Sequence, residues 1–158
     1  MPTIHLTTFV AAPVDRVFDL SRSIDLHKKS MAHTREQAVS GTTSGLIGLN
    51  EWVTWKAKHL FKTRILKTRI TQMERPFSFT DEMMQGDFKS MHHEHHFKQI
   101  ENGSLIIDLF SFETPYGSMG KIANGLFLVS YMKKLLEHRN RAIKESAESE
   151  KWKFILDK

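Results

Sequence analysis

Cysteine is absent from this sequence of 158 residues, and proline and glycine are scarce, with four and eight residues. The absence of cysteine excludes disulfide bonds, thiolate catalysis and cysteine-ligated zinc or iron–sulfur sites. The small number of glycines and prolines excludes a low-complexity linker protein. The longest apolar runs fall far short of the ~20 residues that a membrane-spanning helix needs. We therefore expect a globular domain without a transmembrane segment.

The composition is that of an ordinary folded domain, with 40% hydrophobic and 26% charged residues. The chain begins without a basic region followed by an apolar stretch, so we expect no secretory signal and a cytoplasmic location. Its length fits one domain, which we place at residues 1–149. Residues 150–158 form a tail that is apolar for a free end, and we expect it to be frayed and docked on the surface.

Hydrophobic periodicity divides the chain into a β-rich and a helical part. Even-numbered apolar residues predict a first strand over residues 3–10, and Pro13 is suited to begin a helix over residues 13–21. A second short helix is predicted over residues 24–32. A period of two and intervening turn signals then predict six strands at residues 35–39, 50–60, 62–73, 77–84, 88–100 and 104–114. A helical period returns over residues 118–149.

This order of elements predicts an α+β fold. A curved antiparallel sheet of about seven strands is expected to wrap around the long C-terminal helix, with two short helices after the first strand. The long helix would cover one face of the sheet.

The sequence resembles the START-like (SRPBCC) or helix-grip superfamily, which includes polyketide cyclases, lipid-transfer domains and the birch-pollen allergen. The segment APVDRVFDL at residues 12–20 is similar to the opening motif of that superfamily. A bacterial subgroup of small, uncharacterised ligand-binding SRPBCC proteins is similar in PFSFTDE (76–82), GDFKSMHHEHHF (86–97), Asp108 and PYG (115–117). The resemblance implies a hydrophobic ligand and no cofactor.

Two residues depart from the pattern of that subgroup. Met83 stands where glutamine is common, and Met91 stands where tryptophan is usual. These two departures imply that the pocket lining, and with it the ligand, differ from those of the subgroup.

The dipeptide Asn102-Gly103 is a strong hairpin signal and predicts a two-residue turn. Counting outward from this turn, the cross-strand pairs predicted on the concave face are Phe97 with Asp108, His95 with Phe110, and His93 with Phe112. We therefore predict the following ligand-binding side chains: Trp55, Phe79, Met91, His93, His95, Phe97, Asp108, Phe110 and Phe112.

The polar residues of this face allow several hypotheses. His95 and Asp108 can anchor a polar group of a ligand, or they can form a satisfied pair that only fixes the strand register. His93 and His95 with Asp108 also have the alternation of a metal site, although we expect no bound metal. A histidine tuned by Asp108 can act in acid–base chemistry.

The function predicted from these features is binding of a small hydrophobic or amphipathic molecule between the sheet and the C-terminal helix. One alternative is a cyclase, aromatase or dehydratase that uses a His–Asp acid–base pair. Another is an interaction scaffold whose basic third and fourth strands, at residues 50–60 and 62–73, contact nucleic acid.

The net charge of +5 does not by itself identify a nucleic-acid partner, and we expect none. We interpret the basic strands as a solvated face, and Arg139 and its basic neighbours as charges that complement the helix dipole. The sequence leaves the oligomeric state open.

Overall fold

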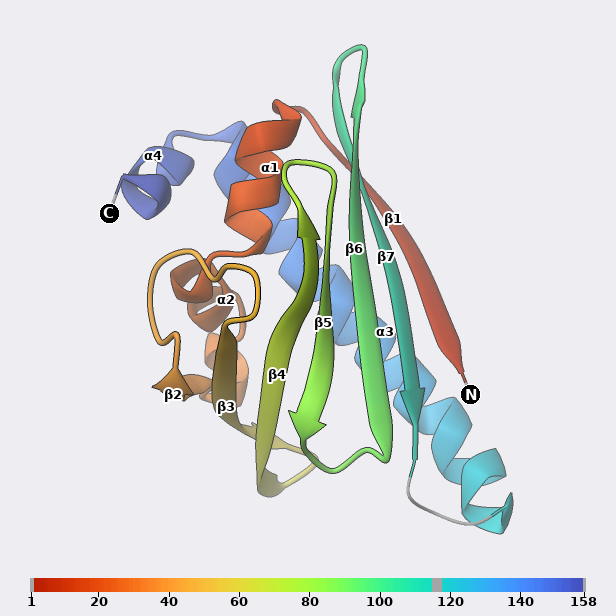
Figure 1. Ribbon diagram of the computed structural model, residues 1–158. Helices are drawn as coiled ribbons and strands as arrows, with labels where there is room; N and C mark the ends of the chain where they lie inside the picture. The colour runs from red at the N-terminus through yellow and green to blue at the C-terminus, as the bar shows by residue number, and fades with distance from the viewer. Residues whose placement is uncertain (1, 115–117, 158) are drawn as a thin grey trace.

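The computed structural model of the chain describes residues 2–114 and 118–157. The elements before the meander are β1 (Thr3–Val10), α1 (Val14–Ser21), α2 (Ile24–Ser30) and the 3₁₀ turn η1 (Ala32–Thr34). The meander comprises β2 (Gln37–Gly41), β3 (Trp52–His59), β4 (Lys62–Glu74), β5 (Ser78–Gln85), β6 (Ser90–Ile100) and β7 (Gly103–Glu113). The helices α3 (Ser118–Glu148) and α4 (Lys151–Leu156) follow (Figure 1). The PYG segment lies outside the described residues.

The seven strands form one antiparallel sheet in the order β1-β7-β6-β5-β4-β3-β2. The meander accounts for β2 to β7, and β1 adds to its end by pairing with β7. The sheet curves across α3, and the short helices α1 and α2 both contact α3 (Figure 1). The predicted α+β helix-grip architecture is confirmed. None of the described helices has the length and the apolar character needed to cross a membrane.

Helix α1 closes one end of the molecule with its apolar face. Its buried residues include Val17 and Phe18, both of which have 0% exposure. The ring of Phe18 contacts Phe79 and Phe97 edge-on, with centroids 5.5 and 5.2 Å away. Edge-to-face aromatic contacts add to the stabilisation from buried area. This aromatic core therefore joins α1 to β5 and β6.

The tail differs from the frayed end expected of it, because residues Lys151–Leu156 form helix α4. The Arg16 guanidinium of α1 lies 4.0 Å from the centre of the Trp152 ring. Ile155 is also buried against the core. Burial of these apolar groups explains why the segment folds onto α1.

The predicted register of the β6–β7 hairpin is wrong by two residues. Ile100 pairs with Gly103, so the turn consists of Glu101 and Asn102. The observed pairs are His95 with Asp108, His93 with Phe110, and Met91 with Phe112. A shift of two residues preserves the face of each side chain, so the predicted concave face is retained.

The position of Gly103 explains the shift. It is the first residue of β7 and lies beside the end of β1, where a Cβ atom would be 2.3 Å from the carbonyl oxygen of Val10. Only glycine permits this approach. The glycine therefore serves a contact between strands rather than the turn.

We expect Gly103→Ala to lower the free energy of unfolding by about 2 kcal/mol or more, because the backbone must move to remove the clash with Val10. Gly48→Ala is the matched control, since its nearest neighbour would be the flexible Glu51 side chain at 3.1 Å. Urea unfolding of both variants measures the difference. Equal effects would contradict the close approach.

Candidate functional site

A cavity of two adjoining chambers lies between the sheet and α3. The outer chamber has a volume of about 360 Å³, and the inner chamber has a volume of about 180 Å³. Trp55, Leu66 and Met132 belong to the walls of both chambers. The two chambers therefore share one boundary, which is formed by β3, β4 and α3.

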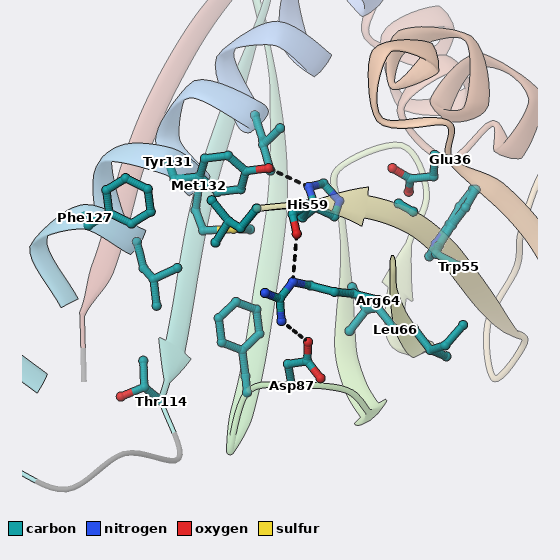
Figure 2. A pocket seen from close by; sticks show the side chains of 16 residues that line it. Glu36, Trp55, His59, Arg64, Leu66, Asp87, Thr114, Phe127, Tyr131 and Met132 are labelled. Atoms are coloured by element: carbon teal, nitrogen blue, oxygen red, sulfur yellow. Dashed lines mark hydrogen bonds and ion pairs between the residues drawn. The ribbon is translucent and has the colours of Figure 1, made fainter. Parts of the chain in front are cut away.

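The outer chamber is lined mainly by apolar side chains, among them Ala57 and Leu66 of the sheet and Phe127 of α3 (Figure 2). A hydrogen bond joins the two sides of this chamber: the Tyr131 hydroxyl of α3 lies 2.7 Å from Nδ1 of His59 at the end of β3. Burial lowers the pKa of His59 and raises that of Tyr131. The neutral imidazole therefore accepts a hydrogen bond from the hydroxyl.

Arg64 forms a second set of polar contacts in the wall of the outer chamber. Its Nε donates to the carbonyl oxygen of His59 at 3.0 Å, and its Nη1 donates to Asp87 at 2.7 Å (Figure 2). Asp87 belongs to the connection between β5 and β6, so Arg64 ties that connection to the β3–β4 hairpin. The rim of the outer chamber is thus held by α3 on one side and by two hairpins on the other.

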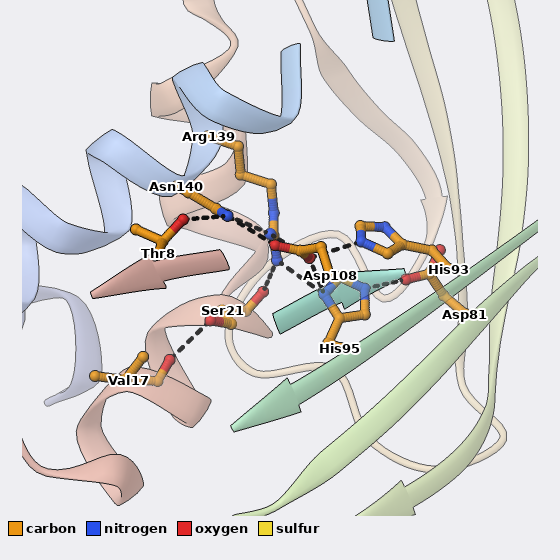
Figure 3. Close-up of polar contacts among 9 residues, drawn as sticks. All are labelled: Thr8, Val17, Ser21, Asp81, His93, His95, Asp108, Arg139 and Asn140. Carbon is orange, nitrogen blue, oxygen red and sulfur yellow. Dashed lines mark hydrogen bonds and ion pairs between the residues drawn. The ribbon is translucent and has the colours of Figure 1, made fainter. Parts of the chain in front are cut away.

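The inner chamber ends at a buried polar network centred on Asp108, whose side chain has 0% exposure. Its Oδ1 accepts a hydrogen bond from Nε2 of His93 at 2.8 Å. Its Oδ2 accepts one from Nδ2 of Asn140 at 2.7 Å, and the same Nδ2 lies 3.1 Å from Oγ1 of Thr8 (Figure 3). The network therefore joins β7, β6, α3 and β1.

Arg139 brings a positive charge into this network. Its Nη1 donates to Oδ1 of Asn140 and its Nη2 donates to the carbonyl oxygen of Ser21, both at 3.0 Å. Nη1 also lies 3.9 Å from Oδ1 of Asp108. The guanidinium is therefore fixed between α1 and α3 and offsets the charge of the buried carboxylate (Figure 3).

His95 binds a second carboxylate. Its Nε2 lies 2.6 Å from Oδ2 of Asp81 on β5, and its ring stacks on that of His93 with centroids 3.7 Å apart. Burial and the neighbouring His93 lower the pKa of His95 to about 3, although Asp81 acts in the opposite direction. A neutral His95 carries its proton on Nε2, where it donates to Asp81, and its Nδ1 faces Arg139 at 3.5 Å.

Both carboxylates stay ionised. Burial raises the pKa of Asp108, but the hydrogen bond from His93 and the positive charge of Arg139 outweigh it and hold the pKa below the ordinary value. For Asp81, burial is likewise outweighed by the hydrogen bond from His95, and its pKa is lowered. The inner end of the cavity thus holds two paired carboxylates and one guanidinium.

Asp81, His93 and His95 also have potential metal-ligand atoms within 4.8 Å of one another. Both Nε2 atoms are used in hydrogen bonds to carboxylates. The fixed charge of Arg139 beside His95 would repel a divalent cation. The arrangement therefore fits a hydrogen-bonding site better than a metal centre. The metal hypothesis from the sequence also used Asp108, which is not in this set.

The structure brings most of the predicted site residues together. Those that line the inner chamber are Trp55, Phe79, Met91, His93, His95 and Phe110, and Trp55 lines the outer chamber as well. Asp108 lies behind His93. Phe97 packs on Phe18 and Phe79, and Phe112 packs on Phe88 and Phe110. Phe97 and Phe112 therefore belong to the core rather than to the chamber walls.

Some members of the network were not predicted from the sequence, namely Asp81, Arg139, Asn140 and Thr8. Asp81 shares the parity of Phe79, two residues earlier on β5, and this alternation places it on the inner face. Arg139, interpreted from the sequence only as a charge that complements the helix dipole, is 6% exposed and joins the network. Arg139 follows the buried Leu136 by three residues, a spacing typical of one helix face. Asn140, next to it, is 1% exposed.

No protein-family model matches the sequence, and no curated protein matches it. Solved structures share its fold. The structure of TTHA0849 from Thermus thermophilus has a TM-score of 0.72 at 16% identity, covering 92% of this chain and 97% of that chain. Ara h 8.0201 has a TM-score of 0.70 at 14% identity, with the same coverage of both chains.

The ginseng major latex-like protein 151 from Panax ginseng is similar in the same way. Its TM-score is 0.70 at 16% identity, and the match covers 94% of this chain and 98% of that chain. At such identities the likeness establishes the fold alone. The chain has the START-like helix-grip fold, as its resemblance to that superfamily implies.

We expect protonation linked to His95 to make stability fall in mild acid. Its folded pKa of about 3 lies below the ordinary value of 6.5, so the unfolded chain takes up a proton first as the pH falls. This contribution is complete above the ordinary pKa and is lost between the two values, at about 1.4 kcal/mol per pH unit. In His95→Gln the slope should decrease by about that amount.

Urea unfolding at several values between about pH 4 and pH 7 measures this slope. His96→Gln is the control, because this neighbouring imidazole is 43% exposed and lies on the other face of β6. An unchanged slope in His95→Gln would show that His95 is not held neutral in the folded state.

Proposed function

We propose that the chain binds a small hydrophobic or amphipathic molecule in the two chambers between the sheet and α3. The supporting observation is an outer chamber of about 360 Å³ with mainly apolar walls. Protein interiors are close-packed and rarely keep voids much larger than a water molecule. Ligand pockets usually measure ~300–1,000 Å³. A cavity of this size therefore suits a ligand better than a packing defect.

The two chambers suit different parts of one molecule. The apolar body would lie in the outer chamber, against Leu66, Phe127 and Met132, where its burial releases water from apolar surface. A polar group would reach the inner chamber, where His93 and His95 lie. Such a division is typical of sites that bind a largely apolar ligand and orient it with few polar groups.

His93 is the best placed of these residues to recognise a polar group. Its Nε2 proton is committed to Asp108, which leaves Nδ1 as an acceptor in the neutral ring. No described residue makes a hydrogen bond to that atom. A hydroxyl or N–H group of the ligand would fit it, since either one supplies a donor.

We expect Ala57→Phe to weaken binding by about tenfold, because the new ring would occupy space in the outer chamber that the ligand needs. Ala57 is buried in the wall of this chamber. Anilinonaphthalenesulfonate is the probe, and fluorescence titration measures its affinity. Thr54→Phe adds the same ring to β3 on the opposite face and should bind as the wild type does. Equal affinities in all three proteins would contradict the proposed site.

Acid–base catalysis of a cyclisation or dehydration is the second candidate function. It is favoured by one observation: the imidazole of His93 lies at the cavity and is held by a carboxylate. A carboxylate fixes the tautomer and orientation of a histidine that acts as a base. The same contact is also suited to simple binding.

Native mass spectrometry of protein purified from its own host separates the two functions. If the chain only binds, wild type and His93→Gln should retain the same molecule, with lower occupancy in the variant because the acceptor is altered. If the chain catalyses a reaction, the variant should instead accumulate a precursor of different mass. His96→Gln, outside the cavity, should match the wild type in either case.

A further inference from the structure

The turn between β3 and β4 breaks two rules of local structure. His59 pairs with Lys62, so Leu60 and Phe61 are the central residues of a two-residue hairpin turn. Both have positive φ angles, 54° and 67°, where glycine, asparagine and aspartate are favoured. Phe61 is also 99% exposed. The chain therefore holds a bulky apolar side chain in water at a backbone position that disfavours it.

Other exposed apolar side chains lie at the same end of the molecule. On α3, Leu126 is 76% exposed and Phe127 is 56% exposed, and Ile65 on β4 is 40% exposed. Leu60, Ile65 and Phe127 all line the outer chamber. The exposed residues Phe61, Ile65, Leu126 and Phe127, which we call the apolar rim, therefore belong to the elements that frame the chamber mouth.

The hairpin that carries Phe61 is basic throughout. Residues 52–73 contain six lysines and arginines and no aspartate or glutamate. Lys58 and Lys62, which flank the turn, are exposed. The nearby Asp87 is paired with Arg64 at 2.7 Å, so its negative charge is offset. Positive charge thus surrounds the apolar tip.

We propose that the apolar rim and the lysines beside it dock on an anionic lipid membrane, with Phe61 inserted at the interface and the chamber mouth turned toward the bilayer. Aromatic and aliphatic side chains gain free energy at the lipid interface, and lysines gain it from anionic headgroups. The β3–β4 turn and the beginning of α3 lie at one end of the molecule, so both can face one surface (Figure 1). This docking goes beyond the proposed function because it does not depend on what occupies the cavity.

A nucleic acid, like an anionic membrane, would attract the lysines, but it would not bury the exposed apolar side chains. Trp55 is only 8% exposed and lies inside the cavity wall, and Lys67 covers the ring of Trp52 at 4.2 Å. These rings are therefore not open for base stacking. Leu126 and Ile65 have no ring with which to stack. The exposed side chains fit a bilayer better than a nucleic acid.

The test is Phe61→Asn in sedimentation with phosphatidylcholine vesicles that contain about one third phosphatidylserine. We expect this variant to bind about tenfold more weakly than the wild type, because the inserted ring is lost. Asparagine tolerates positive φ, so thermal unfolding of the variant should occur at the same temperature or higher. A loss of vesicle binding without a loss of stability cannot come from misfolding. Phe154→Asn, which changes a ring with 76% exposure on α4, is the matched control and should bind as the wild type does.

The electrostatic part has its own control pair. Lys58→Glu with Lys62→Glu should weaken vesicle binding by about tenfold or more, and Lys98→Glu near the other end of the sheet should not. Added salt and removal of phosphatidylserine should weaken wild-type binding too. Absence of wild-type binding to the anionic vesicles, or equal effects of Phe61→Asn and Phe154→Asn, would overturn the proposal. Binding of a single-stranded oligonucleotide that needs the two lysines but not Phe61, with no vesicle binding, would assign the surface to nucleic acid.

Discussion

The carboxylate of Asp108 sets the most demanding condition in this fold, because it is ionised and entirely buried. A buried charge destabilises a protein unless hydrogen bonds and an opposite charge compensate it. Here the partners come from β6 through His93, and from α3 through Asn140 and Arg139. Helix α3 can satisfy the carboxylate only at one rotation about its axis. The network therefore fixes which face of α3 the sheet covers.

That fixed rotation determines the walls of the cavity. Leu135 and Leu136 lie about one turn before Arg139 on α3 and line the inner chamber, and Tyr131 lies a further turn before them. Its contact with His59 holds the helix to β3 at a second level. Polar contacts therefore hold α3 to the sheet at two positions, Tyr131 and Asn140. The chambers lie between the helix and the sheet. The same contacts that stabilise the fold thus maintain the cavity.

The order of the elements could be predicted because the hydrophobic period changes from two to helical values along the chain. The concave face was predicted for the same reason, since an error of two residues in register does not change the face of His95. The register itself depends on Gly103 approaching Val10, a contact between distant residues that no local pattern contains. Asp81 and Arg139 were missed because charged residues are normally exposed. Only the spacing from Phe79 and from Leu136 on their own elements indicates that Asp81 and Arg139 face the interior.

Natural sequences tend to satisfy local and global preferences together, and departures concentrate at functional sites. Two such departures stand out among the residues that the structure describes. One is the group of buried charges around Asp108, and the other is the pair Leu60 and Phe61 at positive φ. The first borders the inner chamber and the second borders the outer chamber, and the two chambers share Trp55. The two departures therefore lie at opposite ends of the adjoining chambers, one at the polar inner end and the other at the rim. This placement would suit the ligand binding that we propose.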